Sequence, residues 1–300
     1  MRITAKKIKK AICNPYWALI VCMPKRISRL LCDRTYLRIK FRANTGQKLR
    51  IDSPVTFNEK LQWLKLYDRK ERYASLVDKY EVRQHITHEI GAEYLVPLLG
   101  VWESADEIDF DSLPQQFVLK PTHTSGCVLI CRDKEQLDLD AARQTMREWL
   151  KQDYYWDHRE WPYKGVAPRI VAEMLIDDKI VDYKFYCFNG EPKVLYLSRG
   201  LEDHTTAEIS FFDLNLNKLP FGRSDYRPYS AIPERPDNFD EMLGIAKKLA
   251  KDFKFIRVDL YNVGGKIYFS ELTFYPCAGY MPFDPPQYDE ILGEMIDLGL

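Results

Sequence analysis

The sequence lacks a hydrophobic run long enough to cross a membrane. Its longest apolar run, from Tyr16 to Met23, is far shorter than the ~20 residues that a transmembrane helix requires. The basic residues Lys25, Arg26 and Arg29 follow this run, where a signal peptide would carry a small-residue cleavage site. The run therefore predicts neither a transmembrane helix nor a signal peptide.

Cysteines in metal-binding pairs are also missing. The seven cysteines are scattered, and although Cys127 and Cys131 lie four positions apart, no second pair accompanies them. A structural zinc site is therefore not expected, because such sites need four closely spaced ligands. We interpret the cysteines as buried, reduced thiols of a cytosolic protein.

Acidic residues are nearly absent from the first fifty positions. Residues 1–50 hold 14 of the 44 Lys and Arg and one acid, Asp33, so the rest of the chain holds 30 Lys and Arg against 43 Asp and Glu. A segment of charge +13 thus precedes a body of charge −13. Such a segment is attracted to an anionic surface, either a membrane leaflet or nucleic acid. A solvated basic helix is the alternative interpretation.

Signals for helices and strands are mixed along the chain. Thr56 and Glu59 form a capping box that predicts the start of an amphipathic helix, and a second helix is predicted from Asp78 to Gly91. Residues 140–150 and 240–252 also predict helices, and 154–165 predicts an aromatic, charged loop. The predicted strands cover 95–101, 117–120, 128–131, 183–188, 193–198, 255–261 and 266–271. Strands and helices do not alternate regularly, so the pattern predicts an α+β fold.

The stretch 117–126 has the character of a phosphate-binding strand and loop. It predicts a strand that ends at Lys120, followed by a small polar loop. A lysine ammonium group and the backbone N–H groups of such a loop are suitable donors to phosphate oxygens. Lys79, at the start of the second predicted helix, would add the helix dipole to the same task. The loop after Lys120 is not a Walker A loop, and the alternative interpretation is a surface lysine before an ordinary turn.

The last predicted hairpin contains charged residues among apolar ones. Arg257, Asp259 and Tyr261 share one face of its first strand, and Glu271 and Thr273 share a face of its second strand. A loop of three or five residues would make Asp259 and Glu271 diagonal neighbours roughly 7–8 Å apart, whereas an even loop would put them on opposite faces. Two converging carboxylates can hold Mg²⁺, and because lone charges in central strands are costly, we favour a site over solvent-facing acids.

Two further strand segments carry polar groups at suitable places. A strand from Ile170 ends in Glu173-Met174-Leu175, and its edge can offer backbone groups to an adenine ring. Asp182 and Lys184 alternate onto one strand face, either as a simple ion pair or as contacts to ribose and phosphate.

In this order, these pieces resemble the ATP-grasp enzymes, and more closely the TupA-like ATP-grasp family of bacterial surface-polysaccharide gene clusters. The matching stretches lie between residue 53 and about residue 285, and they are Thr56–Leu64, Asp78–Tyr80, Phe117–Gly126, Asp182–Phe185 and Glu271–Pro276. The resemblance implies two α+β lobes that clasp ATP, preceded here by a basic helical amino-terminal segment. The expected divisions are 1–75 for that segment, 76–172 for the small lobe and 173–300 for the large lobe with the magnesium-binding hairpin.

The resemblance also implies roles for individual residues. Arg257 and Lys120 would be catalytic, and Asp259, Glu271 and Thr273 would hold Mg²⁺. The residues implied in ATP binding are Lys79, Lys120, Thr122, Ser125, Gly126, Glu173, Met174, Leu175, Asp182 and Lys184. The sequence departs from the family at Thr273, where the third magnesium ligand is usually Asn, and at Thr124, where relatives tend to have Gly.

The chemistry that the resemblance implies is an ATP-dependent joining of a carboxylate to an amine through an acyl phosphate. Electrostatic stabilisation of the triphosphate by magnesium, lysine and arginine would carry the rate. The carboxylate would belong to a uronic acid or similar group of a glycan, and the amine to an amino acid or another small amine. No nucleic-acid partner is expected. We expect a cytoplasmic protein, with peripheral contact at the inner face of the membrane through residues 1–50.

Two rival functions come from the same sequence. Asp109-Phe110-Asp111 matches the Asp-x-Asp metal motif of glycosyltransferases, although we favour an acidic loop because no amino-terminal βαβ nucleotide fold is visible. A non-catalytic binding protein attached through the basic segment is the second rival. A glycan kinase, which would leave phosphate on its product, is a variant of the main hypothesis. The Asp-Phe-Gly and His-Arg-Asp signatures of protein kinases are missing.

Overall fold

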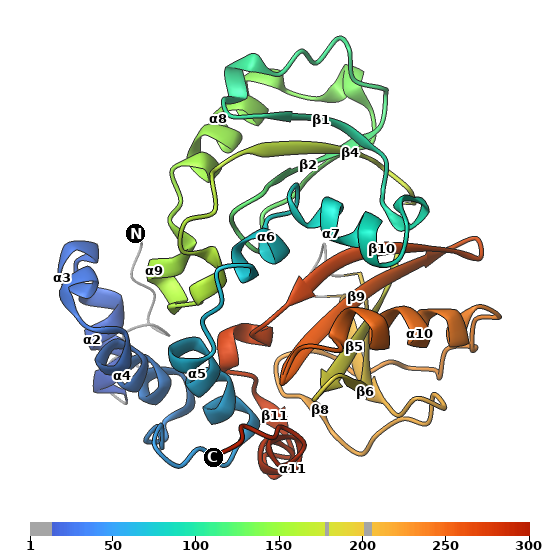
Figure 1. Cartoon of the computed structure of the whole chain (residues 1–300). Coiled ribbons are helices and arrows are strands. Elements are labelled where there is room, and N and C mark those ends of the chain that lie inside the picture. Colours follow the sequence, from blue (N-terminus) through green and yellow to red (C-terminus); the bar gives the residue numbers. More distant parts are fainter. Residues whose placement is uncertain (1–13, 178–179, 201–205) are drawn as a thin grey trace.

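The computed structural model describes residues 14–177, 180–200 and 206–300. Its two larger sheets are antiparallel and lie in separate lobes, with amino-terminal helices beside them (Figure 1). The small lobe has four strands in the order β1-β4-β2-β3, and the large lobe has five in the order β10-β9-β5-β6-β7. The α+β class predicted from the sequence is confirmed.

The small lobe packs its sheet against one long helix. Its strands are β1 (Leu98–Trp102), β2 (Phe117–Pro121), β3 (Leu129–Cys131) and β4 (Ile170–Met174). Helix α8 (Leu139–Leu150) begins where the Asp138 side chain accepts a hydrogen bond from the Ala141 N–H group. Buried Met146 of α8 belongs to the same core as Phe117 and Leu119, so the opposite face of the sheet is left to the neighbouring lobe.

The large-lobe sheet has one apolar face, and its other face is charged where it borders the small lobe. Its strands are β5 (Val181–Phe188), β6 (Glu191–Arg199), β7 (Glu208–Phe212), β9 (Phe255–Val263) and β10 (Lys266–Thr273). Helix α10 (Phe239–Ala250) covers the apolar face, where the Phe185 and Phe239 rings lie 5.9 Å apart. Alternate residues such as Lys184 and Asp259 point to the other face, as the strand period requires.

The two long hairpins of the large lobe have tight two-residue turns. Asn189 and Gly190 adopt φ values of 49° and 84°, and Gly264 and Gly265 adopt 58° and 81°. Positive φ at both central positions is the type I′ geometry that suits the twist of a hairpin. The Asn-Gly turn is as predicted, and the second turn uses only the two glycines of 262–265.

Helices α5 (Phe57–Tyr67), α6 (Tyr73–Val77) and α7 (Val82–Glu89) connect the amino terminus to the lobes. The capping box predicted at Thr56 and Glu59 is confirmed. Buried Phe57 contributes to the large-lobe core, where its ring packs edge-on against Phe255 at 4.9 Å. The helix predicted near Asp78 begins as a turn, in which Asp78 Oδ1 accepts hydrogen bonds from the N–H groups of Tyr80 and Glu81, and α7 itself starts at Val82.

The basic amino-terminal region is helical where the structure describes it. Its helices are α2 (Pro15–Cys22), α3 (Lys25–Leu30) and α4 (Asp33–Thr45). Arg159, which is fully buried, connects this region to the body of the protein. Its Nε atom lies 3.1 Å from Asp33 Oδ1, one Nη atom donates to the Ser28 carbonyl, and its guanidinium lies over the Tyr36 and Trp156 rings.

The remaining elements join or cover the lobes. The predicted loop 154–165 in fact contains α9 (Tyr154–His158) and a short 3-10 helix, η4 (Trp161–Tyr163). Strands β8 (Gly222–Arg223) and β11 (Phe283–Asp284) pair with each other, and α11 (Tyr288–Glu294) packs on α5. The other 3-10 helices are η1 (Ala92–Tyr94), η2 (Ala105–Glu107), η3 (Lys134–Gln136) and η5 (Pro276–Gly279).

The lobes do not divide where the sequence-based boundaries lie. The boundary expected after residue 172 passes through β4, so Glu173 and Met174 belong to the small-lobe sheet. The residues of α5 and α6, expected in the amino-terminal segment, pack into the large-lobe core. Their apolar faces are too short to form a core of their own, so they add to the nearest larger one.

Candidate active site

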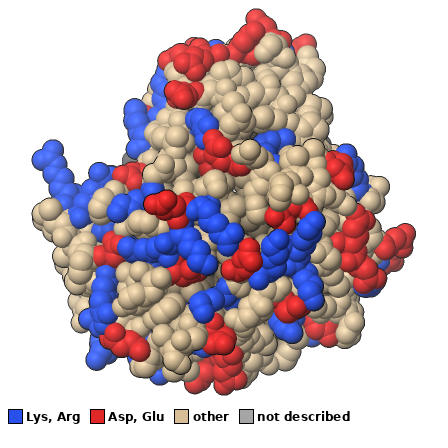
Figure 2. Space-filling model, viewed as in Figure 1, with Lys and Arg blue, Asp and Glu red and all other residues tan. Residues whose placement is uncertain are grey.

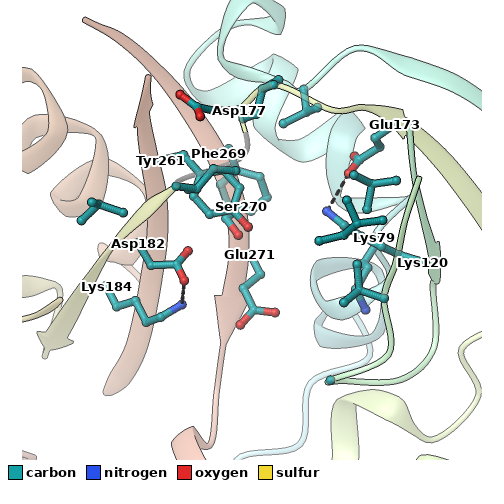
Figure 3. Close-up of a pocket in the computed structure, with 18 of the residues that line it drawn as sticks. Lys79, Lys120, Glu173, Asp177, Asp182, Lys184, Tyr261, Phe269, Ser270 and Glu271 are labelled. Atoms are coloured by element: carbon teal, nitrogen blue, oxygen red, sulfur yellow. Dashed lines mark hydrogen bonds and ion pairs between the residues drawn. The ribbon is translucent and has the colours of Figure 1, made fainter. Parts of the chain in front are cut away.

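A cavity of about 980 Å³ lies between the small and large lobes. Its small-lobe wall contains Lys79, Lys120 and Glu173, and its large-lobe wall contains Asp182, Lys184 and Glu271. Figure 3 shows Lys79 and Lys120 across the cavity from Asp182 and Lys184, with Glu271 between them. On the surface, Lys and Arg side chains gather across the middle of the molecule, where the lobes meet (Figure 2). The volume falls at the upper end of the range for small-molecule sites, about 300–1,000 Å³.

Glu173 fixes two cations in the small-lobe wall. Its Oε2 atom accepts a hydrogen bond from Lys120 Nζ at 2.9 Å, and its Oε1 atom accepts one from Arg83 Nη1 at 3.2 Å. Burial disfavours the charged form of Lys120, but the Glu173 carboxylate outweighs it and raises the pKa of the Lys120 ammonium above its usual value. Lys120 is therefore a permanent positive charge at the end of β2.

Lys79 and the loop 121–126 hold each other in place. Lys79 Nζ donates hydrogen bonds to the carbonyl oxygens of Pro121 and Thr124, and burial lowers the pKa of Lys79. Ser125 and Gly126 line the cavity and supply the small side chains predicted there. Thr122 does not belong to the described cavity wall; it is fully buried, and its hydroxyl donates to the Ala167 carbonyl.

Asp259 and Glu271 are direct register partners on β9 and β10. The two-residue turn pairs Phe269 with Leu260 and would, if the register continued, pair Asp259 with Ser270. A β-bulge at Ser270 shifts the register by one residue, so that Glu271 faces Asp259 and Thr273 faces Arg257. The expectation that an even loop separates the two acids is therefore wrong, because it assumed an unbroken ladder.

A row of polar side chains crosses the charged face of the large-lobe sheet. Tyr196, Lys184, Asp259 and Glu271 are successive partners on β6, β5, β9 and β10. Lys184 Nζ lies 3.0 Å from Asp259 Oδ2 and 3.1 Å from Asp182 Oδ2, and these carboxylates raise the pKa of Lys184 although burial opposes it. The other oxygen of Asp182, Oδ1, is buried and has no hydrogen-bond partner within the described residues.

Arg257 joins the two acids of the hairpin. Its Nε and Nη2 atoms donate to the two oxygens of Asp259 at 2.7 and 2.6 Å, and Nη2 also donates to Glu271 Oε1 at 2.8 Å and to Thr273 Oγ1 at 2.9 Å. Burial alone would raise the pKa of Glu271, but Arg257, Lys184 and Lys79 lower it to about 2. Glu271 is therefore ionised at every physiological pH.

The donor set of this hairpin is chemically suitable for Mg²⁺ but is partly engaged. Asp259 is fully buried and both of its oxygens accept from cations, whereas the Glu271 side chain is about 36% exposed and faces the cavity. Thr273 Oγ1 donates to Glu271 Oε1, and neither Thr273 nor Asp259 lines the cavity in the described part of the chain. Within that part, no group of three His, Cys, Asp or Glu residues could hold a metal by itself.

One end of the cavity is apolar. Met174 and Leu175 line it where β4 ends, and Met174 is 36% exposed. The wall around them is completed by Leu95, Val96, Val118, Ile130 and Phe269. This end is suited to a flat, uncharged ring, while the charged groups described above lie further along the cavity.

The Asp-x-Asp motif of the glycosyltransferase alternative lies away from the cavity. Asp109 and Asp111 are exposed, and Asp109 Oδ1 accepts from the Asp111 N–H group in a local turn away from the cavity wall.

Polar residues that the sequence analysis does not predict also line the cavity, among them Arg83, Tyr196 and Arg223. No local pattern marks Arg223, because it follows an irregular stretch and is brought to the cavity only by the pairing of β8 with β11.

Several solved structures resemble this chain in fold. D-alanine–D-alanine ligase from Bacillus anthracis complexed with ATP is 18% identical, with a TM-score of 0.45, over 74% of this chain and 64% of that one. The Helicobacter pylori D-alanine–D-alanine ligase is 14% identical, with a TM-score of 0.41, over 82% of this chain and 70% of that one. N5-carboxyaminoimidazole synthetase from Staphylococcus aureus is 13% identical, with a TM-score of 0.36, over 66% of this chain and 44% of that one.

Similarities at this level concern the fold alone. The chain spans less than two thirds of the Bacillus anthracis and Staphylococcus aureus proteins. No curated protein matches the sequence. A family model described as "TupA-like ATPgrasp" matches residues 59–297, from the first turn of α5 to just beyond α11 and including both walls of the cavity. The resemblance inferred from the short motifs is confirmed: this chain belongs to the TupA-like ATPgrasp family.

Proposed function

We propose that this protein is an ATP-dependent ligase that joins a carboxylate to an amine through an acyl phosphate. One observation carries the proposal: Lys79, Lys120 and Glu271, which lie far apart in the sequence, line a single cavity between the two sheets. Two cations opposite an ionised acid are the arrangement that a metal-bound triphosphate needs. The family assignment supports the same chemistry.

The nucleotide would lie along the cavity from its apolar end to its charged end. Adenine would contact Met174 and Leu175, and the triphosphate would lie near Lys79, Lys120, Ser125 and Gly126. The buried Asp182 Oδ1 lacks a donor among the described residues, and a ribose hydroxyl would supply one. Lys184 would remain next to Asp182 as part of the same wall.

Glu271 would hold Mg²⁺, with Asp259 and Thr273 next to it. Asp259 would join the coordination only as Arg257 moves from it, because Arg257 now occupies both Asp259 oxygens. When bound, Mg²⁺ supplies charge neutralisation of the triphosphate and orients it for attack. Arg257, once released from Asp259, would be free to steady the transferring phosphoryl group.

The reaction is balanced without a nucleophilic side chain. A carboxylate oxygen of the substrate attacks the γ-phosphorus, the bond between the γ-phosphorus and the β,γ-bridging oxygen breaks, and ADP leaves. An amine then attacks the carbonyl carbon of the acyl phosphate, so that a C–N bond forms, a proton is released and phosphate leaves. Lys120 and Arg257 contribute fixed positive charge where negative charge develops.

The proposed substrates follow the family resemblance. The carboxylate would be a uronic acid or similar group of a bacterial surface polysaccharide, and the amine an amino acid or another small amine. The test is ADP and phosphate release in the presence of Mg²⁺ with a panel of uronic acids and amines, together with mass spectrometry of the product. An amide product with one phosphate released per ADP is expected, and EDTA should abolish it.

Two controls separate the proposal from its rivals. Lys120→Met should abolish ADP release, whereas Lys247→Met, at a 61% exposed position on α10, should not. A phosphorylated product without free phosphate would indicate a kinase instead. Absence of Mg-ATP binding would contradict the proposal as a whole.

The amino-terminal helices support a peripheral membrane contact. No helix in the described ranges is long and apolar enough to span a bilayer. Large apolar side chains are nevertheless exposed on α2 and α3, including Leu19, Ile27 and Leu30, and Lys25 and Arg26 lie beside them. Such a surface is suited to an anionic leaflet at the inner face of the membrane. Co-sedimentation with vesicles that contain phosphatidylglycerol, lost in an Ile27→Glu and Leu30→Glu variant, would test it.

A further inference from the structure

The cavity extends beyond the region that a nucleotide would occupy. Past Lys184 and Glu271, the large lobe contributes a further wall made by Tyr196, Arg223, Tyr226 and Arg257. Tyr196 is the β6 partner of Lys184, so this wall continues the polar row that contains Asp259 and Glu271. It is aromatic and cationic, in contrast to the apolar end where we place adenine.

Arg223 is held in one orientation by its neighbours. Its Nε and Nη2 atoms donate to the two oxygens of Asp225 at 2.9 and 2.7 Å, and its guanidinium lies 4.6 Å from the centre of the Tyr226 ring. Its remaining nitrogen, Nη1, lies 3.3 Å from Tyr196 Oη and 3.1 Å from Cys277 Sγ. Nη1 therefore donates to a phenol hydroxyl and to a thiol, and the thiol is the weaker of these two acceptors.

An ordinary surface ion pair does not account for this arrangement. The Asp225 side chain is 46% exposed and lies on the solvent side of the pair, whereas the Arg223 side chain is only 13% exposed and lines the cavity. A surface pair contributes little to stability and does not need a buried guanidinium. A ligand carboxylate at the Nη1 edge of Arg223 would therefore replace the weak thiol acceptor and share this edge with the Tyr196 hydroxyl, while Asp225 and Tyr226 keep the orientation of the guanidinium fixed.

Arg257 lies near the same wall. Arg257 is on β9, and its Nη2 atom donates to Thr273 Oγ1 at the end of β10. Burial raises the pKa of the Cys277 thiol, and both Arg223 and Arg257 lie close enough to oppose this rise. Both guanidinium groups already pair with carboxylates, Arg223 with Asp225 and Arg257 with Asp259 and Glu271, so what this wall offers a ligand is a set of N–H donors. Planar guanidinium groups bind carboxylates particularly well, because their N–H groups match the two oxygens.

We propose that Arg223, with Tyr196, binds the carboxylate of the substrate and holds it beside Arg257 and Glu271 for attack on the γ-phosphorus. The assignment rests on the proposed ligase function and adds a substrate-binding residue that the motifs do not contain. It identifies the ligand class as a sugar acid, recognised at its carboxylate by Arg223 and able to stack on the Tyr226 and Tyr196 rings. An uncharged sugar of the same shape should not bind.

The test is calorimetric titration of the intact chain in two steps. Mg-AMPPNP, which cannot transfer its γ-phosphoryl group, is bound first, and sodium D-glucuronate, sodium D-galacturonate or D-glucose is then added. The wild type should bind at least one uronate and should not bind glucose. Arg223→Gln should weaken uronate binding at least tenfold and leave Mg-AMPPNP affinity within twofold, and Arg223→Lys should be intermediate because it keeps the charge but not the planar fork.

A matched control is available on the surface. Arg235 also pairs with an aspartate, Asp240 at 2.7 Å, and lies 4.7 Å from an aromatic ring centre, that of Phe239, but it is 43% exposed and does not line the described cavity. Arg235→Gln should therefore bind uronate as the wild type does.

The outcomes separate this inference from the proposed function. Three outcomes would overturn the inference and leave the nucleotide site unaffected. They are unchanged uronate binding in Arg223→Gln, equal binding of glucose and uronate, and failure of a chain that binds Mg-AMPPNP to bind either uronate. Failure of the wild type to bind Mg-AMPPNP would overturn the proposed function, and with it this assignment. Unchanged Mg-AMPPNP affinity in Arg223→Gln also excludes misfolding as the cause of lost uronate binding.

Discussion

Asp259 and Glu271 face each other across β9 and β10 only because Ser270 forms a bulge between them. The same bulge brings Thr273 opposite Arg257, so one extra residue aligns both acids, the arginine and the hydroxyl on the charged face of the sheet. Bulges next to functional sites are known to redirect side chains in this way. The alignment of these four side chains in the proposed site therefore depends on one inserted residue in β10.

Replacing Glu271 should remove ATP turnover without unfolding the protein. Glu271→Gln removes the only acid of the hairpin that faces the cavity, and we expect ADP release to fall by about 10²-fold or more. The pKa of Glu271 is lowered to about 2, so the loss should be the same at pH 6 and pH 9. Exposed Glu234 offers a control, and Glu234→Gln should keep wild-type rates. Retained turnover in Glu271→Gln would remove this residue from the site.

Stability should depend on pH through Glu160. This side chain is buried, Lys65 and Lys40 lie near it, and burial raises its pKa from 4.5 to about 7. A raised pKa means that the folded state prefers the protonated acid, so the contribution is present below about pH 4.5 and is lost as pH rises through 7. Relative to Glu160→Gln, the wild type should lose about 2 kcal/mol of unfolding free energy between pH 5 and pH 8.

Urea denaturation at the two pH values would measure this difference. Exposed Glu103 provides the control, since Glu103→Gln should track the wild type at both pH values. A wild type that gained stability over Glu160→Gln as pH rises would show that the nearby lysines, and not burial, dominate the titration of Glu160.

The amino-terminal helices should depend on Arg159 for their attachment. Arg159→Ala removes a fully buried guanidinium, leaves the Ser28 carbonyl without its donor and leaves Asp33 with Arg69 and Tyr155 as partners, and we expect about 2–3 kcal/mol of destabilisation. Arg72 also pairs with an aspartate and lies over aromatic rings, but it is 47% exposed. Arg72→Ala should cost less than about 1 kcal/mol. Limited proteolysis between α2 and α4, faster only in Arg159→Ala, would confirm the local effect.

Two helical glycines should respond to alanine with opposite signs. A Cβ atom on Gly293 of α11 would lie 2.2 Å from the Val55 carbonyl oxygen and 2.7 Å from the Phe57 nitrogen, so Gly293→Ala must shift backbone and should cost about 2 kcal/mol or more. Gly244 of α10 has nothing within 4 Å of that position. Gly244→Ala should therefore stabilise the protein by about 0.5–1 kcal/mol. Thermal or urea unfolding of both variants would measure the contrast.

Local chemistry made part of this structure predictable. The capping box at Thr56 and Glu59 and the Asn189-Gly190 turn are short-range signals, and both appear where the sequence indicated. Lys120 was placed at a strand end because the apolar run before it stops there. Each of these signals depends only on residues within a few positions of one another.

Features that depend on long-range pairing were not predictable in the same way. The bulge at Ser270 has no local signal in the sequence, so residue spacing alone does not determine whether Asp259 and Glu271 face each other. The helix predicted near Asp78 starts four residues later, at Val82, because the Asp78 side chain first caps a turn that leads into it. Arg223 reaches the cavity through the β8–β11 pair, whose two strands lie some sixty residues apart and are only two residues long.

The contacts of Lys79 imply that nucleotide affinity and loop order are thermodynamically coupled. Its ammonium group donates to two carbonyl oxygens of the loop 121–126, and a phosphate that takes more than the third N–H group of this ammonium must displace them. The free energy gained from the lysine–phosphate contact would therefore be reduced by the cost of the lost lysine–loop hydrogen bonds. The measured nucleotide affinity would report the gain minus this cost. A variant whose loop no longer accepted from Lys79 would bind nucleotide more tightly and hold its empty loop less firmly.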